Sequence, residues 1–229
     1  MKAIILAAGK GSRLGEYTGG KPKCLLMLGQ ESILSREIRI LKECGVPETN
    51  IYVVGGYNCE LLEPIAPNLI YNAQYETKDN SYSLGLALET VWDDDVLVLD
   101  ADLCFDKELL LEIIHDTRDN VLMSRRASDL EESTGIVTGE SERVKAIGKQ
   151  YRNTGYVYIS IFKIGKSTIP ELRIKLLAEK SVRTWYTLAI TELCETRPFY
   201  NRVTEQRWHE IDFPQDYLET IELFQLGGE

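Results

Sequence analysis

The residues with the clearest chemical potential lie in a glycine-rich segment near the amino terminus. The apolar run Lys2–Leu6 is typical of a buried strand, and Gly9 and Gly11 follow it closely. Glycine tolerates positive φ and lets backbone N–H groups approach an anion. Arg13 adds a forked cation that matches phosphate oxygens, and Lys23 adds a compact charge. Together these residues predict a loop that binds nucleotide phosphates. The alternative is an ordinary strand-to-helix turn with basic surface residues, which would explain the glycines alone.

The spacing of these glycines excludes the two commonest phosphate loops. The chain has no G-x-x-x-x-G-K-[ST] string here, so the segment is not a Walker A loop. It also lacks a G-x-G-x-x-G string followed by an acidic residue about twenty positions later, which disfavours a dinucleotide-binding fold.

Two carboxylates follow the apolar run Val96–Leu99. Asp100 and Asp102 come at the carboxyl end of this predicted strand, where open α/β sheets bind ligands. Alternation along a strand would place both side chains on one face. Magnesium takes one or two carboxylates together with substrate phosphate, so the segment predicts a metal site. The alternative is helix capping or turn formation, and for Asp100 a structural role is favoured.

Residues 6–23 read L-A-A-G-x-G-x-R-L-x-x-x-T-x-x-x-P-K, which resembles the signature of the sugar-nucleotide pyrophosphorylase-like nucleotidyltransferases. The resemblance covers most of the chain, more loosely after about residue 125. It is closest to the small cytidylyltransferases that activate phosphocholine and aminoalkylphosphonates. It implies that Lys23 and Arg13 are catalytic, at the α-phosphate and the departing pyrophosphate respectively. It also implies nucleotide binding by the rest of the loop, namely Leu6, Ala7, Ala8, Gly9, Gly11 and Ser12.

The same resemblance implies the metal ligands. Asp102 matches the family's metal-binding aspartate, and Asp212 matches a second ligand in a late W-x-E-I-D-x-P-x-D segment. An alternative for Asp212 is a capping box with Gln215, although one carboxylate has oxygens for both roles. Glu210 is expected on the same strand face as Asp212 and is a weaker candidate, assigned to the acceptor. The interpretation therefore requires Asp102 and Asp212 to meet at one Mg²⁺ beside the glycine turn.

A polar string opens the helix predicted at residues 81–92. Its backbone N–H groups and small side chains could read the edge of a pyrimidine, or could simply cap the helix. The string resembles an N-x-x-S-L segment of the phosphocholine and phosphonate branch, which implies base recognition by Asn80, Ser81 and Ser83.

The predicted acceptor pocket involves a lysine and two aromatic residues. Lys149 matches in position a family lysine that neutralises the acceptor's phosphate, and the alternative is a solvated hairpin lysine. Trp185 and Tyr186, and likewise Trp208 and Tyr82, could offer aromatic faces to an ammonium group, although such residues more often pack in a core or at its rim.

Composition limits the class of protein. The chain has 229 residues and a net charge of −10, which disfavours nucleic-acid partners and leaves small-molecule substrates. No apolar run approaches the roughly 20 residues that span a bilayer, and no leader-like segment precedes the first strand. An odd set of five cysteines without C-x-x-C spacing predicts reduced thiols and a cytoplasmic location. A homodimer is left open.

The pattern of elements predicts an α/β fold. Strands and helices alternate in the first half, which implies a doubly wound, mainly parallel sheet. Closely spaced strands after residue 120 predict a small antiparallel excursion that binds the acceptor. Strands are predicted at 2–6, 51–54, 68–71, 96–99, 121–123, 135–138, 143–147 and 156–162, with a final pair within 199–212. Helices are predicted at 32–44, 81–92, 106–115, 166–179, 182–196 and 214–226. We expect one domain, 1–229, with a Rossmann-like nucleotide-binding core (1–125), an acceptor-binding region (126–212) and a carboxyl-terminal helix (213–229).

The resemblance implies a Mg²⁺-dependent transfer of CMP from CTP to a small phosphorylated or phosphonylated alcohol or amine. The attacking oxygen is already ionised near neutral pH, so catalysis reduces to positioning and charge neutralisation. Three alternatives stay open. They are a sugar-1-phosphate nucleotidyltransferase that uses UTP, dTTP or GTP, a metal-dependent glycosyltransferase with a D-x-D motif, and a catalytically silent regulatory subunit.

Overall fold

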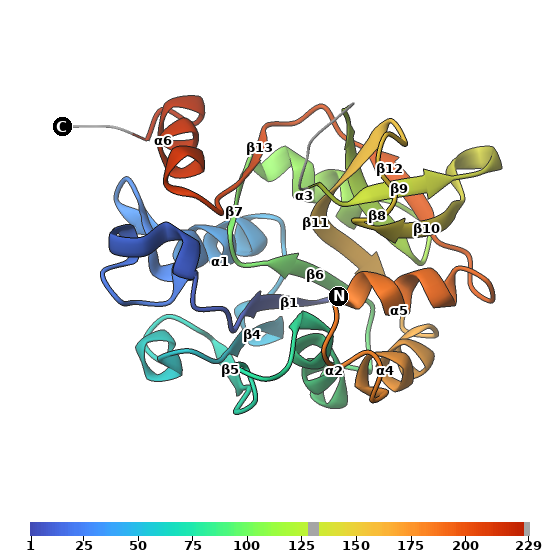
Figure 1. Cartoon of the computed structure of the whole chain (residues 1–229), viewed down its shortest axis with the longest axis horizontal. Helices are drawn as coiled ribbons and strands as arrows, with labels where there is room; N and C mark the ends of the chain where they lie inside the picture. Colours follow the sequence, from blue (N-terminus) through green and yellow to red (C-terminus); the bar gives the residue numbers. More distant parts are fainter. Residues whose placement is uncertain (128–132, 227–229) are drawn as a thin grey trace.

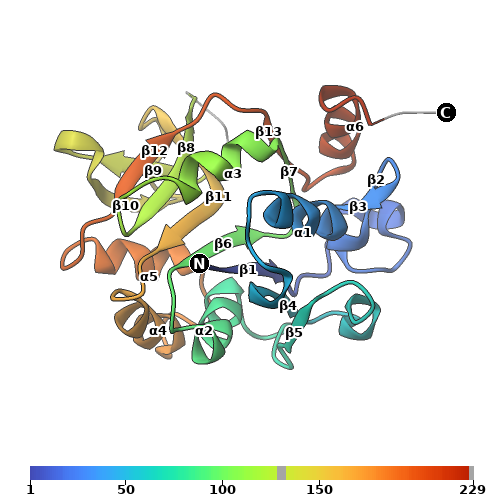
Figure 2. The same ribbon diagram turned by 180° about the vertical axis from the view of Figure 1, so that it is seen from behind.

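A nine-stranded mixed sheet forms the centre of the molecule, with helices on both faces (Figures 1 and 2). The computed structural model describes residues 1–127 and 133–226. Four neighbouring strands run parallel, in the spatial order β6 (Val96–Asp100), β1 (Lys2–Ala7), β4 (Ile51–Gly55) and β5 (Asn68–Tyr71). This half confirms the predicted doubly wound, parallel core.

The other half of the sheet is largely antiparallel. Strand β11 (Tyr156–Ile164) lies antiparallel to β6 and to β8 (Val121–Arg126), and β8 pairs in parallel with β12 (Tyr200–Val203). A hairpin of β9 (Gly135–Thr138) and β10 (Val144–Gly148) extends from β11. This is the predicted antiparallel excursion, whose role in acceptor binding stays a prediction.

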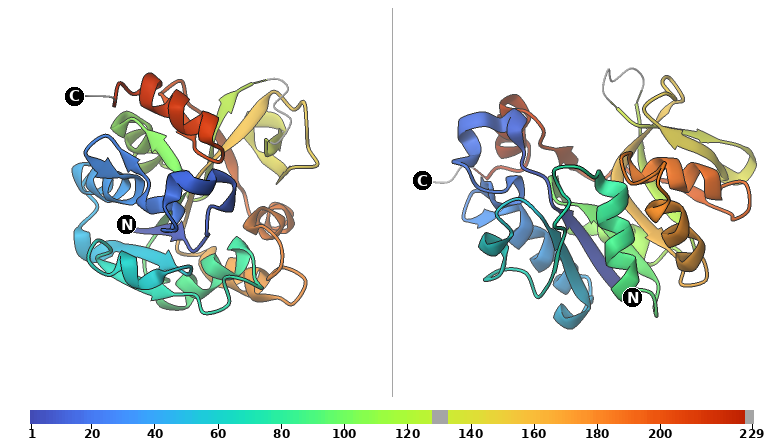
Figure 3. Two further views of the ribbon diagram at one scale, coloured as in Figure 1. Left: turned by 60° about the vertical axis from the view of Figure 1, so that its left-hand side comes forward. Right: turned by 60° about the horizontal axis from the view of Figure 1, so that its bottom comes forward.

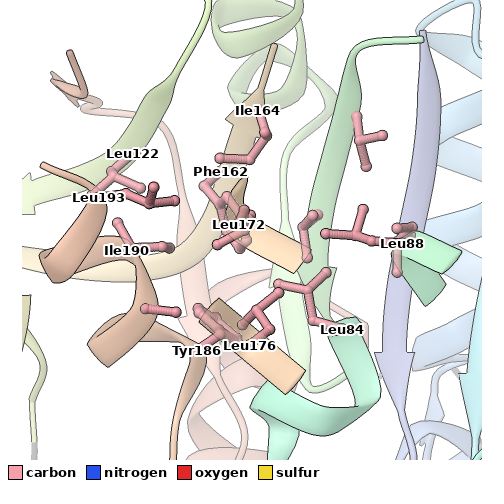
Figure 4. Packing of buried hydrophobic residues seen from close by; sticks show 14 of the residues in the cluster. Leu84, Leu88, Leu122, Phe162, Ile164, Leu172, Leu176, Tyr186, Ile190 and Leu193 are labelled. Carbon is pink, nitrogen blue, oxygen red and sulfur yellow. The ribbon is translucent and has the colours of Figure 1, made fainter. Parts of the chain in front are cut away.

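Alternation along β1 divides the core into two layers. Ile4 and Leu6 face the layer of α2 (Asn80–Thr90), α4 (Ile169–Leu177) and α5 (Tyr186–Leu193). Ala3, Ile5 and Ala7 face the layer of α1 (Ile33–Glu43) and α3 (Lys107–Ile114). Figure 4 shows the first layer, in which leucines of α2 and α4 meet Ile190 and Leu193 of α5 beside Phe162. Each fully buried side chain of this kind stabilises the fold by roughly 1.5–3 kcal/mol.

The two helices predicted at 166–179 and 182–196 are shorter than expected. The structure has α4 at Ile169–Leu177 and α5 at Tyr186–Leu193, with hydrogen-bonded turns between them. Trp185 is therefore the residue that precedes α5 rather than a residue of its interior.

The remaining short elements are 3-10 turns and a two-strand hairpin. They are η1 (Ser12–Thr18), η2 (Lys23–Leu25), β2 (Met27–Leu28), β3 (Glu31–Ser32), η3 (Glu48–Asn50), η4 (Cys59–Leu62) and η5 (Glu140–Glu142).

The two strands predicted within 199–212 are both present, but they belong to different sheets. Strand β12 adds to the main sheet, whereas β13 (Trp208–Glu210) pairs with β7 (Leu103–Phe105), a strand too short to be noticed in the sequence. Just beyond this ladder, the Ile211 N–H donates to the Asp102 carbonyl oxygen at 2.9 Å. The β7–β13 pair thus holds the segments around residues 102 and 212 together.

Helix α6 (Pro214–Leu223) ends before the predicted Leu226 and packs on η1, as Figure 3 shows for the red helix beside the blue amino-terminal segment. The rings of Tyr17 and Tyr217 meet edge to face with centroids 5.5 Å apart. The predicted capping box of Asp212 with Gln215 is wrong. Asp216 instead accepts from the backbone N–H groups of Asp212 and Phe213, at 2.8 and 2.7 Å. The Asp212 carboxylate is left for other partners.

All five cysteines are free thiols. In the described part of the chain, no helix is both long and apolar enough to cross a membrane. The cytoplasmic location and a homodimer stay predictions.

Candidate active site

Lys23 lies between the two aspartates that the sequence singled out. Its Nζ is 2.9 Å from Asp102 Oδ2 and 2.5 Å from Asp212 Oδ1. The three residues come from η2, from the turn between β6 and β7, and from the segment between β13 and α6. The structure therefore brings together residues that lie far apart in the chain, as the interpretation required.

Gly11 makes this approach of Lys23 possible. A Cβ atom added at Gly11 would lie 2.5 Å from the Lys23 Cβ, and Gly11 has a φ of +69°. Both observations require glycine, because a side chain would clash with Lys23 and would strain the backbone. The second glycine of the amino-terminal string thus serves the placement of the lysine.

Arg13 extends the same group of charges toward solvent. Its Nη1 lies 3.1 Å from Asp212 Oδ2, and its Cζ lies 5.4 Å from the centroid of the Phe213 ring. About half of the Arg13 side chain is exposed. Arg13 is thus held at the edge of the site, where a phosphate can reach it.

A cavity of about 640 Å³ adjoins these charges and is walled by both halves of the sheet. Many of the predicted site residues line it: Arg13, Asn80, Asp100, Asp102, Lys149, Trp185, Tyr186, Glu210 and Asp212. A cavity of this size suits a nucleotide or another small ligand.

Two of the predicted base-reading residues lie outside this wall. The Ser83 hydroxyl accepts from Asn72 Nδ2 at 3.0 Å, inside the protein. Ser81 is also fully buried, and its hydroxyl has no hydrogen-bond partner among the described residues. Asn80 does line the cavity, and its Oδ1 accepts from the Tyr186 N–H at 3.0 Å, which ties α2 to α5. Base recognition by these three residues stays a prediction.

Tyr186 is a core residue rather than an open aromatic face. Only 2% of it is exposed, and its ring packs 5.2 Å from that of Phe162 in the cluster of Figure 4. Its hydroxyl donates to Asp100 Oδ2 at 3.0 Å. This position favours the packing alternative for Tyr186 and gives Asp100 a structural partner.

The alternation argument for Asp100 and Asp102 does not hold, because β6 ends at Asp100 and Asp102 lies in the turn that follows. Burial and the neighbouring Asp102 carboxylate raise the pKa of Asp100. Burial and the nearby aspartates also raise the pKa of Glu210. Partial burial opposes ionisation of Asp212, yet Lys23 and Arg13 outweigh it and lower the pKa of Asp212.

The same balance acts on Lys23. Burial alone would lower its pKa, but the charges of Asp102 and Asp212 raise the pKa of Lys23 above its ordinary value. Two carboxylates, Asp102 and Asp212, thus share one lysine ammonium, which leaves excess negative charge. A cation of higher charge would relieve this imbalance.

The aspartates fit a divalent cation that also binds substrate. Asp102 Oδ1 is buried and has no hydrogen-bond partner in the described part of the chain. Within residues 1–127 and 133–226, no group of three or more His, Cys, Asp or Glu side chains forms a metal cluster. Two carboxylates completed by substrate phosphate are the usual protein contribution to a Mg²⁺ site. Asp102 and Asp212 would be those two ligands.

Two charged residues in or near the site were not predicted from the sequence. Arg125 lines the cavity from the end of β8, and its place in a pair of arginines directly after an apolar strand was a usable signal. Glu37 is fully buried in α1, where burial and the Asp102 charge raise its pKa. Its spacing from Leu34 and Leu41 on the apolar side of the helix could have marked it.

Comparison with known proteins defines the class. Residues 3–189 match the family model of the MobA-like NTP transferase domain. The chain therefore belongs to this family and is a nucleotidyltransferase, as the amino-terminal signature predicted.

The relatives narrow the class further. The chain is 39% identical over 106 residues to choline-phosphate cytidylyltransferase of Streptococcus pneumoniae, a match that covers 44% of each protein. The match thus spans less than half of that relative. It is 24% identical to CTP:phosphoglutamine cytidylyltransferase of Campylobacter jejuni, over 97% of this chain and 100% of the relative. A solved structure of CTP:phosphocholine cytidylyltransferase from S. pneumoniae superposes with a TM-score of 0.83 at 26% identity, covering 97% of this chain and 98% of that one.

Proposed function

We propose that this protein transfers CMP from CTP to the phosphate or phosphonate of a small acceptor and releases pyrophosphate. The observation that carries the proposal is the Lys23 ammonium held between Asp102 and Asp212 at the edge of a cavity of about 640 Å³. The cytidylyltransferase relatives of S. pneumoniae and C. jejuni support CTP as the nucleotide.

The reaction needs positioned charges more than a general base. An acceptor oxygen, already ionised, attacks the α-phosphorus in line, and the bond to the β-phosphate oxygen breaks. Lys23 stabilises charge that develops on the α-phosphate, and Arg13 binds the departing pyrophosphate. Asp102 and Asp212 would hold a Mg²⁺ ion, which when bound supplies further charge neutralisation at the phosphates.

Lys23 has two uses in this scheme. Without substrate it neutralises Asp102 and Asp212, which would otherwise repel each other. With a Mg²⁺ ion held by those carboxylates, the Lys23 ammonium would be free to contact a phosphate oxygen of the nucleotide. The buried, doubly paired lysine is thus a preorganised charge for the transition state.

The acceptor side consists of Lys149, Trp185 and Glu210 in the cavity wall. Lys149 lines the same cavity as Asp212, and we assign it to neutralise the acceptor's phosphate. The two relatives are named for phosphocholine and phosphoglutamine, so phosphorylated small molecules are the class to test.

A pyrophosphate-release screen tests the proposal. CTP, UTP, GTP, dTTP and ATP are each combined with Mg²⁺ and with phosphocholine, 2-aminoethylphosphonate, phosphoethanolamine, O-phosphoserine or sugar 1-phosphates. We expect release with CTP and a phosphorylated or phosphonylated amine. Release confined to UTP, dTTP or GTP with a sugar phosphate would instead identify a sugar-1-phosphate nucleotidyltransferase. Release with no pair would contradict nucleotidyl transfer and favour a regulatory subunit.

A further inference from the structure

Two indole rings in the cavity wall are covered by cations of the protein itself. Lys149 Nζ lies 3.9 Å from the centroid of the Trp185 ring. Arg125 Cζ lies 5.7 Å from the centroid of the Trp208 ring, and all four residues line the same cavity. Both contacts are in the range of cation–π interactions.

This arrangement bears on the acceptor. A quaternary ammonium group binds best against uncovered aromatic faces. Here Trp185 and Trp208 already carry a positive charge, and Tyr186 is packed in the core. An acceptor whose only charge besides its phosphate is an ammonium would therefore meet repulsion at both indoles.

Two donors of the Arg125–Trp208 pair have no hydrogen-bond acceptor in the described part of the chain. Arg125 Nε and Trp208 Nε1 are both buried, and neither has a hydrogen-bond partner among the described residues. Both atoms are donors, and buried donors without partners cost free energy. Arg125 also makes no ion pair with any residue in the described part of the chain. A planar group with two negatively charged oxygens would satisfy such donors, as guanidinium–carboxylate pairs do.

The two cations come from different segments of the cavity wall. Lys149 follows β10 and covers Trp185, whereas Arg125 lies in β8 and covers Trp208. The wall therefore offers two separate positive groups, one for the phosphate and one for a second anionic group on the same molecule.

We propose that the acceptor carries a carboxylate in addition to its phosphate or phosphonate, and that Arg125 and the Trp208 N–H bind this carboxylate. The inference rests on the proposed function and specifies its acceptor class. Glu210 also lines the cavity, and its carboxyl group can accept a hydrogen bond from an amino group on the same molecule. The class is therefore phosphorylated or phosphonylated amino acids rather than choline-like alcohols.

Matched acceptors test this directly. O-Phosphoserine is phosphoethanolamine with one added carboxylate, and 2-amino-3-phosphonopropionate is related to 2-aminoethylphosphonate in the same way. With CTP and Mg²⁺, we expect kcat/KM to be about 10- to 100-fold higher for the carboxylated member, the range for a hydrogen bond to a charged group. Equal values, or a preference for phosphocholine, would overturn the inference and leave cytidylyl transfer intact.

Variants test whether Arg125 and Trp208 cause the preference for the carboxylated acceptor. Arg125→Gln should bring the ratio of kcat/KM within each pair close to unity, and Trp208→Phe, which keeps the ring and removes the N–H, should lower it part of the way. Arg126→Gln is the matched control, because Arg126 is exposed, stacks on Tyr156 at 5.8 Å and lies outside the cavity wall. A ratio that survives in Arg125→Gln, or falls equally in Arg126→Gln, would contradict the assignment.

Binding provides a readout that does not depend on turnover. Calorimetric titration of O-phosphoserine and phosphoethanolamine into the wild-type protein and Arg125→Gln measures the same discrimination. Tighter binding of O-phosphoserine that is lost in the variant supports the carboxylate site even where no acceptor in the pyrophosphate screen reacts. Equal binding of the two compounds to the wild-type protein would refute it.

Discussion

The molecule has two clusters of partly buried charges at opposite ends of the strands of the main sheet, and their carboxylates are paired differently. The Lys23 cluster (Lys23, Asp102, Asp212 and Arg13) lies beyond the carboxyl end of β6. The Asp116 cluster (Asp116, Arg118, Lys163 and Arg202) lies before the start of β8, with Lys163 opposite Leu97 near the start of β6.

In the Asp116 cluster the carboxylate is fully satisfied. Asp116 Oδ1 accepts from the Arg118 N–H at 3.0 Å and from its Nε at 2.9 Å, while Oδ2 accepts from Arg118 Nη2 at 2.5 Å. Arg202 Nη1 reaches Oδ2 at 3.5 Å, and Lys163 donates to the Asp116 carbonyl oxygen. These bonds connect the loop between α3 and β8 with β11 and β12, so the cluster stabilises the fold.

The Lys23 cluster leaves hydrogen-bonding capacity unused. Asp102 Oδ1 is buried without a partner in the described chain, and the same holds for Arg125 Nε across the cavity. A charged group that serves only the fold gains by completing its bonds, because an unpaired buried charge is costly. The two carboxylates therefore differ: both oxygens of Asp116 are hydrogen-bonded, whereas one buried oxygen of Asp102 has no partner among the described residues, as expected of a group that binds a ligand.

The largest effect is expected for Lys23→Ala. Loss of this charge should lower the rate of pyrophosphate release by a factor on the order of 10²–10³, the range for removing one transition-state donor. Initial rates with CTP and the best acceptor measure it. Lys21→Ala is the control, because Lys21 is exposed and close in sequence. An unchanged rate in Lys23→Ala would remove Lys23 from the mechanism.

Asp116→Asn should affect stability instead of turnover. The side chain is only 4% exposed, and its loss leaves two arginines without their carboxylate. We expect the free energy of unfolding to fall by about 1.5–3 kcal/mol, the range for hydrogen bonds to charged groups. Urea denaturation measures this, and initial rates at 25 °C should match the wild type.

Asp93→Asn is the matched control for Asp116→Asn. Asp93 pairs with Lys2 at the surface, where solvent screens the interaction, so its loss should barely change the urea midpoint. The distinction between the clusters would be contradicted if Asp116→Asn reacted more slowly under conditions in which it is fully folded. It would also be contradicted if the two variants were equally destabilised.

Local patterns made the Lys23 cluster partly predictable. A strand, two glycines and two cations within about twenty residues predict a phosphate-binding loop, since turn geometry and charge are local properties. The place of Asp102 also followed, because carboxyl ends of parallel strands meet at one edge of a sheet. Both predictions depend on residues close in sequence or on a general property of the fold.

The rest depends on contacts that sequence patterns do not encode. The β7–β13 pair that brings Asp212 to Asp102 consists of two three-residue strands about a hundred residues apart, too short for a periodic signal. Asp216 rather than Gln215 caps α6, and both choices satisfy the same local rule. The contact of Arg125 with Trp208 likewise depends on tertiary packing.

Asp212→Asn tests whether the Lys23 cluster binds a metal ion through Asp212. Replacing an ionised ligand by an amide should raise the Mg²⁺ concentration for half-maximal rate by at least about tenfold. A loss of about tenfold in metal affinity is the lower limit for mutating even a residue that only hydrogen-bonds to a metal ligand. Calorimetric titration of Mn²⁺ gives a readout without turnover. Asp100→Asn should shift both values less, because Asp100 bonds to Tyr186. A larger shift in Asp100→Asn would exchange the roles of the two aspartates.

The smallest effect concerns pH and the Asp116 cluster. Hydrogen bonds from Arg118 lower the pKa of Asp116 from 3.8 to about 2. A depressed folded-state pKa means that the stabilisation is complete above the unfolded value and is lost as pH falls toward the folded one. Between about pH 4.5 and 3.5 this group should therefore cost the wild type about 0.5 kcal/mol of stability that Asp116→Asn does not lose. Urea midpoints of both proteins at the two pH values measure the difference, which should narrow on acidification. A gap that widens would mean that Asp116 is not held ionised by Arg118, and that its carboxylate is no better paired than that of Asp102.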